Sequence, residues 1–138
     1  MRGMLGQLIE HGNQYTVVDM EASVEHMSRG TYRHVDVLLI VLEPYYRSLE
    51  TAGRMAPLAQ GLGIGRVYGV ANKVRSARDE AAVLDYCAKH TIELVARIPF
   101  DEAIVEADRA GIALIDHQPD APAVEEIRQL ARRLEEAA

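Results

Sequence analysis

The sequence has one cysteine, no long apolar run and no concentration of basic residues. Cys87 cannot form an intramolecular disulfide, and no other residue pairs with it at metal-site spacing. The longest apolar run, Val37 to Leu42, is far shorter than the ~20 residues that cross a bilayer. The amino terminus also lacks the basic and then apolar pattern of a signal peptide. These absences predict a cytoplasmic protein that does not enter membranes.

The charge balance excludes a typical nucleic-acid-binding surface. The chain has 15 Lys and Arg residues against 21 Asp and Glu, for a net charge of −6, and the two signs are mixed along it. Nucleic-acid binding needs Lys and Arg gathered on one face. With 138 residues, 49% of them hydrophobic, we expect a single domain over residues 1–138 that buries roughly two-thirds of its unfolded surface.

Strand-like and helix-like segments alternate along the chain. Continuous apolar runs that end at Pro, Asn or acidic residues predict strands covered on both faces, as in a parallel sheet. The alternation predicts an α/β fold, a three-layer domain with a mainly parallel sheet and helices on both faces. The expected strands are Tyr15 to Val18, Val35 to Leu42, Arg66 to Ala71 and Ile92 to Ile98, with a possible brief edge strand at Ile112 to Ile115.

Helices are expected between these strands and at both ends of the chain. Asp101 and Gly111 are good cap residues for a helix through Ala110, and Pro57 should kink or end its helix near Ala56 at a cost of about 3 kcal/mol. The other expected helices are Met1 to Glu10, a segment that Ser48 caps and that runs toward Leu62, Arg78 to His90, and a closing helix that Asp120 caps.

Polar residues follow the expected strands at what should be one edge of the sheet. They are Asp19 and Glu21, Asn72 and Lys73, and the stretch from Pro99 through Phe100 to Asp101. Open α/β sheets bind ligands at the carboxyl ends of their strands. Each feature also has a purely structural interpretation: Asp19 as a cap on the next turn, Asn72 as a turn residue and Asp101 as a helix cap.

Several of these stretches together resemble the deviant P-loop ATPases of the MinD, ParA and nitrogenase iron protein group (SIMIBI-type). The most similar type is the CooC-type carbon monoxide dehydrogenase maturation ATPase. The resemblance covers nearly the whole chain, and its short motifs occur in the family's order. They are DMEASVEHMSRGT, Glu43-Pro44 with the following RSLETA, Asn72-Lys73-Val74, IPFDEAIVEAD and PDAPAVEEI.

The resemblance implies a role for each candidate residue. Asp19 would be the switch II carboxylate that orders magnesium through water, so no direct metal ligand is expected, and Glu21 would sense the γ-phosphate. Asn72, with the adjacent Lys73, would contact the adenine edge. The stretch Pro99-Phe100-Asp101 would wall the base. The family's cofactors are ATP and magnesium, and its activity is ATP-dependent nickel insertion into a carbon monoxide dehydrogenase, the client metalloenzyme.

The phosphate-binding part of the family pattern is absent from these 138 residues. No GxxxxGK[ST] or similar lysine-containing loop occurs, and the stretch Gly61 to Gly65 lacks the lysine. The family's paired cysteine motif is absent as well. We therefore expect the chain to correspond to the carboxyl-terminal half of such an ATPase, starting within the helix ahead of the switch II strand. We expect no tight ATP binding and no ATPase activity from this chain alone.

In the related sheets, the phosphate-loop strand lies between the switch II strand and the next one, here Val35 to Leu42. Its absence would leave unpaired strand edges, which invite pairing with another chain. We expect the Tyr15 to Val18 strand either to close against Val35 to Leu42 or to pair in a homodimer. Two function classes follow: a nucleotide-binding maturation factor, or a non-catalytic α/β interaction module derived from such an ATPase.

Overall fold

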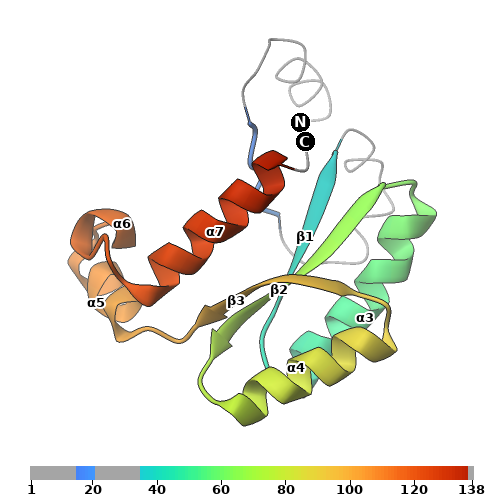
Figure 1. Cartoon of the computed structure of the whole chain (residues 1–138), viewed down its shortest axis with the longest axis horizontal. Coiled ribbons are helices and arrows are strands. Elements are labelled where there is room, and N and C mark those ends of the chain that lie inside the picture. Colours follow the sequence, from blue (N-terminus) through green and yellow to red (C-terminus); the bar gives the residue numbers. More distant parts are fainter. Residues whose placement is uncertain (1–14, 21–34, 137–138) are drawn as a thin grey trace.

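The centre of the fold is a parallel sheet. The computed structural model describes residues 15–20 and 35–136 of the chain. Within them, β1 (Val37–Leu42), β2 (Arg66–Val74) and β3 (Glu93–Pro99) pair in the order β1-β2-β3, all parallel (Figure 1). The predicted α/β class with a parallel sheet is confirmed.

Helices cover both faces of this sheet (Figure 1). The two helices that connect the strands pack on one face, and the closing helix packs on the other, so the predicted three layers are present. The two shorter helices follow β3. The bounds are α3 (Tyr46–Gly61), α4 (Ala77–Lys89), α5 (Glu102–Ala110), α6 (Leu114–His117) and α7 (Pro122–Glu136).

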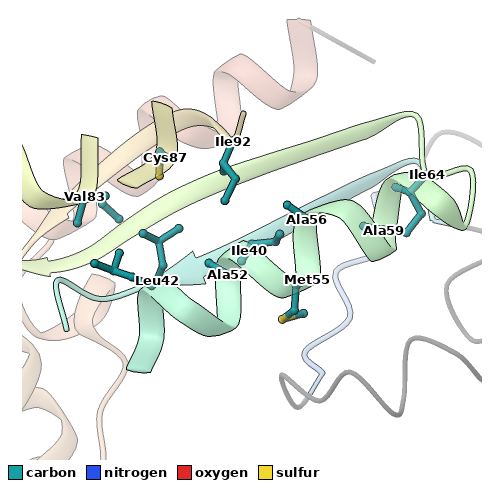
Figure 2. Packing of buried hydrophobic residues seen from close by; sticks show 12 residues of the cluster. Ile40, Leu42, Ala52, Met55, Ala56, Ala59, Ile64, Val83, Cys87 and Ile92 are labelled. Atoms are coloured by element: carbon teal, nitrogen blue, oxygen red, sulfur yellow. The ribbon is translucent and has the colours of Figure 1, made fainter. Parts of the chain in front are cut away.

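The larger core lies between the sheet and helices α3 and α4. Figure 2 shows β1 side chains meeting α3 and α4 across this layer, and Leu42 and Val83 are fully buried there. In β2, Gly69 leaves room for this packing, because a Cβ atom there would lie 2.9 Å from Ile92 Cγ2. Small residues along α3 let the helix approach the sheet closely; they are Ala52, Ala56 and Ala59.

A smaller core lies under α7 on the opposite face. Val70 of β2, Ala96 of β3 and Leu130 of α7 are buried together. Arg133 of α7 donates from Nη1 to the Val95 carbonyl oxygen at 2.7 Å, at an irregularity in the β2–β3 pairing. The contact gives the Val95 carbonyl oxygen a donor at the point where the ladder between β2 and β3 is irregular.

The expected strand at Tyr15 to Val18 is wrong. These residues are irregular and exposed, and Val17 is 93% exposed. β1 is an edge strand among the described residues, and Tyr15 to Val18 do not close against it. A strand needs a neighbour to pair with, and no described strand pairs with this run. The expected helix at residues 1–10 lies outside the described residues.

The expected early end of this helix near Ala56 is also wrong. Helix α3 begins at Tyr46, before Ser48, and continues through Pro57 to Gly61. Pro57 is exposed while Ala56 and Ala59 beside it are buried against the sheet, so packing outweighs the local cost of proline. Ser48 is not the cap: its Oγ accepts a hydrogen bond from the Glu43 backbone N–H at 2.9 Å.

Two predictions near the carboxyl terminus need correction. Ile112 to Ile115 do not form an edge strand, because the short helix α6 begins at Leu114. Helix α7 begins at Pro122, directly after Ala121, so Asp120 is one residue too early to be its cap. No helix among residues 15–20 and 35–136 is long and apolar enough to cross a membrane.

Candidate functional site

The carboxyl ends of the strands lie at one edge of the sheet because the strands are parallel. Glu43 follows β1, Lys73 lies at the end of β2, and the two side chains meet there. Glu43 Oε1 lies 2.6 Å from Lys73 Nζ, with the carboxylate 28% and the ammonium 51% exposed. The structure therefore brings the end of β1 to the predicted adenine-side residues of β2.

Strand β2 continues through Asn72 and Lys73 to Val74, so the expected strand end at Ala71 comes too early, and the pairing with β3 is irregular between Ala71 and Val74. Lys73 has φ of 57°, in the left-handed region that few non-glycine residues adopt. Its backbone N–H donates to Asn72 Oδ1 at 3.0 Å. The interpretation of Asn72 as a turn residue is wrong, because Asn72 lies within β2. With Oδ1 engaged, the amide NH₂ is the part of this half-buried side chain that offers hydrogens to a ligand.

The β2 and β3 ends are joined through Phe100. The Phe100 backbone N–H donates to the Val74 carbonyl oxygen at 2.9 Å, and Pro99 pairs with Val74 in the sheet. The guanidinium carbon of Arg75 lies 3.5 Å from the centroid of the Phe100 ring. The sequence singled out Phe100 but not Arg75, whose only signal was its position directly after the Asn72-Lys73-Val74 motif.

Asp101 caps two helices. Its Oδ1 accepts from the Ala103 N–H at 3.0 Å, at the start of α5, and its Oδ2 accepts from the Ala123 N–H at 3.4 Å, at the start of α7. The predicted cap on α5 is confirmed. Each helix N-terminus carries partial positive charge that a carboxylate stabilises. Both oxygens of Asp101 therefore already have hydrogen-bond donors in this structure.

The acidic residues of the predicted site are Asp19 and Glu21, and the structure describes the first of them. Asp19 is exposed, and the following Met20 packs against the core between the sheet and α3. An exposed carboxylate is a suitable oxygen acceptor for a water on magnesium, so Asp19 fits the water-mediated role. Glu21 lies outside the described residues. In the part of the chain that is described, no three His, Cys, Asp or Glu residues gather closely enough to hold a metal.

A groove of 460 Å³ lies beside this edge, between β3 and α7. Val74 and Pro99 line its end nearest the candidate site, and Arg97 and Glu80 form an ion pair at 3.2 Å in its wall. The groove does not include Asn72 or Phe100. The candidate site is therefore an open edge in the described residues.

Among residues 15–20 and 35–136, two groups have a raised pKa, and both lie in α4, away from this edge. Burial raises the pKa of the Cys87 thiol, which keeps it protonated and inert near neutral pH. Partial burial and the nearby Glu50 carboxylate raise the pKa of Tyr86. These groups therefore do not supply a nucleophile for the candidate site.

Comparison with known proteins shows what the chain is similar to. No family model matches the chain. The carbon monoxide dehydrogenase accessory protein CooC of Rhodospirillum rubrum is 40% identical to it over 119 residues, which are 86% of this chain and 44% of that protein. The chain is homologous to CooC. A second relative, an uncharacterised ATP-binding protein of Methanocaldococcus jannaschii, is 37% identical over 112 residues, 80% of this chain and 43% of that protein.

Solved structures agree on the fold. The MinD cell division protein of Aquifex aeolicus superposes with a TM-score of 0.65 at 22% identity, over 76% of this chain and 46% of that one. The chain spans less than half the length of CooC and of the archaeal relative. The predicted resemblance to CooC-type proteins and the MinD-like fold are confirmed, while the roles of individual residues stay predictions.

Proposed function

We propose that these residues form the base-binding half of a nucleotide site in a CooC-like maturation factor, which uses ATP to insert nickel into a carbon monoxide dehydrogenase. The observation that carries the proposal is the 40% identity to CooC over 119 residues. The meeting of the β1, β2 and β3 ends at one sheet edge supports it, because ligands of such folds bind there.

The described residues divide into two roles in this proposal. The Asn72 amide hydrogen-bonds the adenine edge, with Lys73 beside it, and Pro99, Phe100 and Asp101 shape the wall around the base. Asp19 orders a magnesium-bound water, where its negative charge balances the metal. Magnesium, when bound, neutralises phosphate charge during phosphoryl transfer. Glu21 is proposed to respond to the γ-phosphate.

The phosphates of the nucleotide require a partner segment in this proposal. Phosphate binding depends on backbone N–H groups and a lysine, and no stretch of these 138 residues has that pattern. We expect calorimetric titration of the chain with magnesium ATP to show a Kd no tighter than about 1 mM, which corresponds to about −4.1 kcal/mol. A micromolar Kd would contradict the assignment of phosphate binding to another segment.

A complementation experiment provides the positive test. The chain is mixed with a polypeptide that carries a lysine-containing phosphate loop of this family, and ATP hydrolysis is measured. We expect hydrolysis from the mixture, none from the same mixture when the loop lysine is replaced by Gln, and a large loss with Asp19→Asn in this chain. Hydrolysis that is insensitive to Asp19→Asn would remove Asp19 from the proposed role. Reading the coding frame ahead of Met1 for such a loop is a simple companion test.

A second candidate function is binding to a protein partner without catalysis. It is supported by exposed apolar residues in and directly after β1, which is an edge strand in the described part of the chain: Val41 is 59% exposed and Tyr46 75%. We propose that this edge pairs with a second copy of the chain. Sedimentation velocity should show a dimer that Val41→Lys shifts toward monomer, and a monomer at all concentrations would contradict the pairing.

A further inference from the structure

The contact between Arg75 and Phe100 places a flat cation at the proposed base site. The guanidinium carbon lies 3.5 Å from the ring centroid, which is the van der Waals separation of two stacked planes. Arg75 is exposed and Phe100 is half-buried. One face of the Phe100 ring is therefore covered by the guanidinium of an exposed residue.

Hydrogen bonds from the backbone hold both residues in this position. The Arg75 N–H donates to Asp79 Oδ2 at 2.9 Å, and the Asp79 N–H donates to Ser76 Oγ at 3.1 Å, as part of the cap of α4. The Phe100 N–H donates to the Val74 oxygen at 2.9 Å. The stacked pair therefore does not depend on the cation–π contact alone.

We propose that Arg75 is a base-stacking residue: the outer face of its guanidinium stacks on the purine ring while the Asn72 amide donates to the ring edge. This inference rests on the function proposed above. Arginine suits such a place because its planar, weakly hydrated guanidinium stacks on aromatic faces, which a lysine ammonium cannot do. Asn72 lies near the carboxyl end of β2 and Arg75 directly follows its last residue, Val74, so both lie at the same strand end.

The contact allows one other arrangement, in which a base displaces Arg75 and stacks on Phe100 directly. In that case Arg75 would compete with the ligand, and its removal would strengthen binding. In the proposed arrangement its removal weakens binding. The two arrangements thus predict changes of opposite sign.

Adenosine is the appropriate probe because it carries the base and no phosphate charge. The full chain, labelled with ¹⁵N, is titrated with adenosine, and the Asn72 side-chain amide and the Arg75 Nε–H signals are followed. We expect both to shift in the unmodified chain, with a Kd in the millimolar range. With Arg75→Gln, the initial slope of the Asn72 shift should fall at least about fivefold, the lower end of the effect of losing one stacking contact.

Two further variants separate stacking from charge and from misfolding. Arg75→Lys keeps the charge without the plane and should behave like Arg75→Gln. Arg78→Gln removes an exposed arginine from the first turn of α4 and should leave the slope unchanged. Backbone spectra of all variants should match outside residues 72–80 and 99–102.

The outcomes separate this inference from the proposed function. An Arg75→Gln variant that binds adenosine as well as the unmodified chain, or more tightly, overturns the base-stacking role and leaves the base site at Asn72 standing. Retained binding by Arg75→Lys with loss in Arg75→Gln would also overturn it, since charge would then be sufficient. Absence of any Asn72 shift in the unmodified chain would instead overturn the base-binding function itself.

Discussion

Two apolar runs in this chain have similar residues but different structures. The first, Tyr15 to Val18, is irregular and exposed, while the second forms β1. β1 pairs with β2 from Val37 to Leu42, and its inward side chains are buried under α3. β-propensity describes how well a residue fits a pleated, half-buried surface. The difference between the runs therefore comes from the presence of a neighbouring strand.

The carboxylates that follow the two runs differ in the same way. Glu43 after β1 is held by Lys73 at 2.6 Å from the neighbouring strand. Asp19 after the first run is exposed. A strand-end carboxylate becomes fixed when an adjacent strand end brings it a partner. The partner segment proposed above for the phosphates would supply such a neighbour beside residues 15–18.

The largest expected effect is a loss of stability, which is tested by matched truncations in the two runs. Leu42 is 0% exposed, and Leu42→Ala should lower the free energy of unfolding by about 2–5 kcal/mol, through lost burial and a residual cavity. Val17→Ala, at a 93% exposed position, should change it by less than about 0.5 kcal/mol. Urea denaturation followed by circular dichroism measures both. A comparable loss for Val17→Ala would show that the first run is packed in solution.

Local patterns were sufficient for most of the fold. Continuous apolar runs predicted β1 and its neighbours, and the parallel sheet follows from their alternation with helices. Asp101 and Gly111 marked α5 correctly: Asp101 caps it, and Gly111 ends it with φ of 65°. These features could be predicted because each depends on residues that are close in the sequence.

Features that depend on distant residues could not be predicted. The continuation of α3 through Pro57 depends on packing against the sheet, and the start of α7 depends on a carboxylate 22 residues earlier in the chain. The Arg75–Phe100 contact joins two strand ends that become neighbours only in the folded sheet. The residues of the candidate site were thus predictable, while the contacts that position them were not.

A smaller loss of stability is expected when the carboxylates Asp101 and Asp19 are replaced. Asp101→Ala removes the side-chain caps of both α5 and α7 and should cost about 1–3 kcal/mol, at about 1 kcal/mol for each cap. Asp101→Asn keeps one acceptor oxygen and should cost less. Asp19→Ala, at an exposed position, should cost less than about 0.5 kcal/mol.

Thermal and urea unfolding of the three carboxylate variants provide the measurement, and Asp120→Ala is an additional control. Because α7 begins at Pro122 and takes its cap from Asp101, Asp120→Ala should be nearly neutral. If Asp120→Ala is as costly as Asp101→Ala, the start of α7 is capped locally and the double role of Asp101 is wrong.

The smallest expected effect concerns the ion pair that joins the β1 and β2 ends. A double-mutant cycle with Glu43→Gln and Lys73→Gln should give a coupling of about 0.2–1 kcal/mol, because both side chains are partly exposed to water. The matched control is the Asp85–Lys89 pair on α4, at 2.7 Å but with both side chains about two-thirds exposed. We expect the Glu43–Lys73 coupling to be the larger, since solvent screens it less, and to decrease between low salt and 1 M salt. Equal couplings would show that the strand-end pair is as solvated as a pair on a helix surface. Lys73 would then fix the position of Glu43, which Asp19 lacks, without adding more stability than an exposed ion pair does.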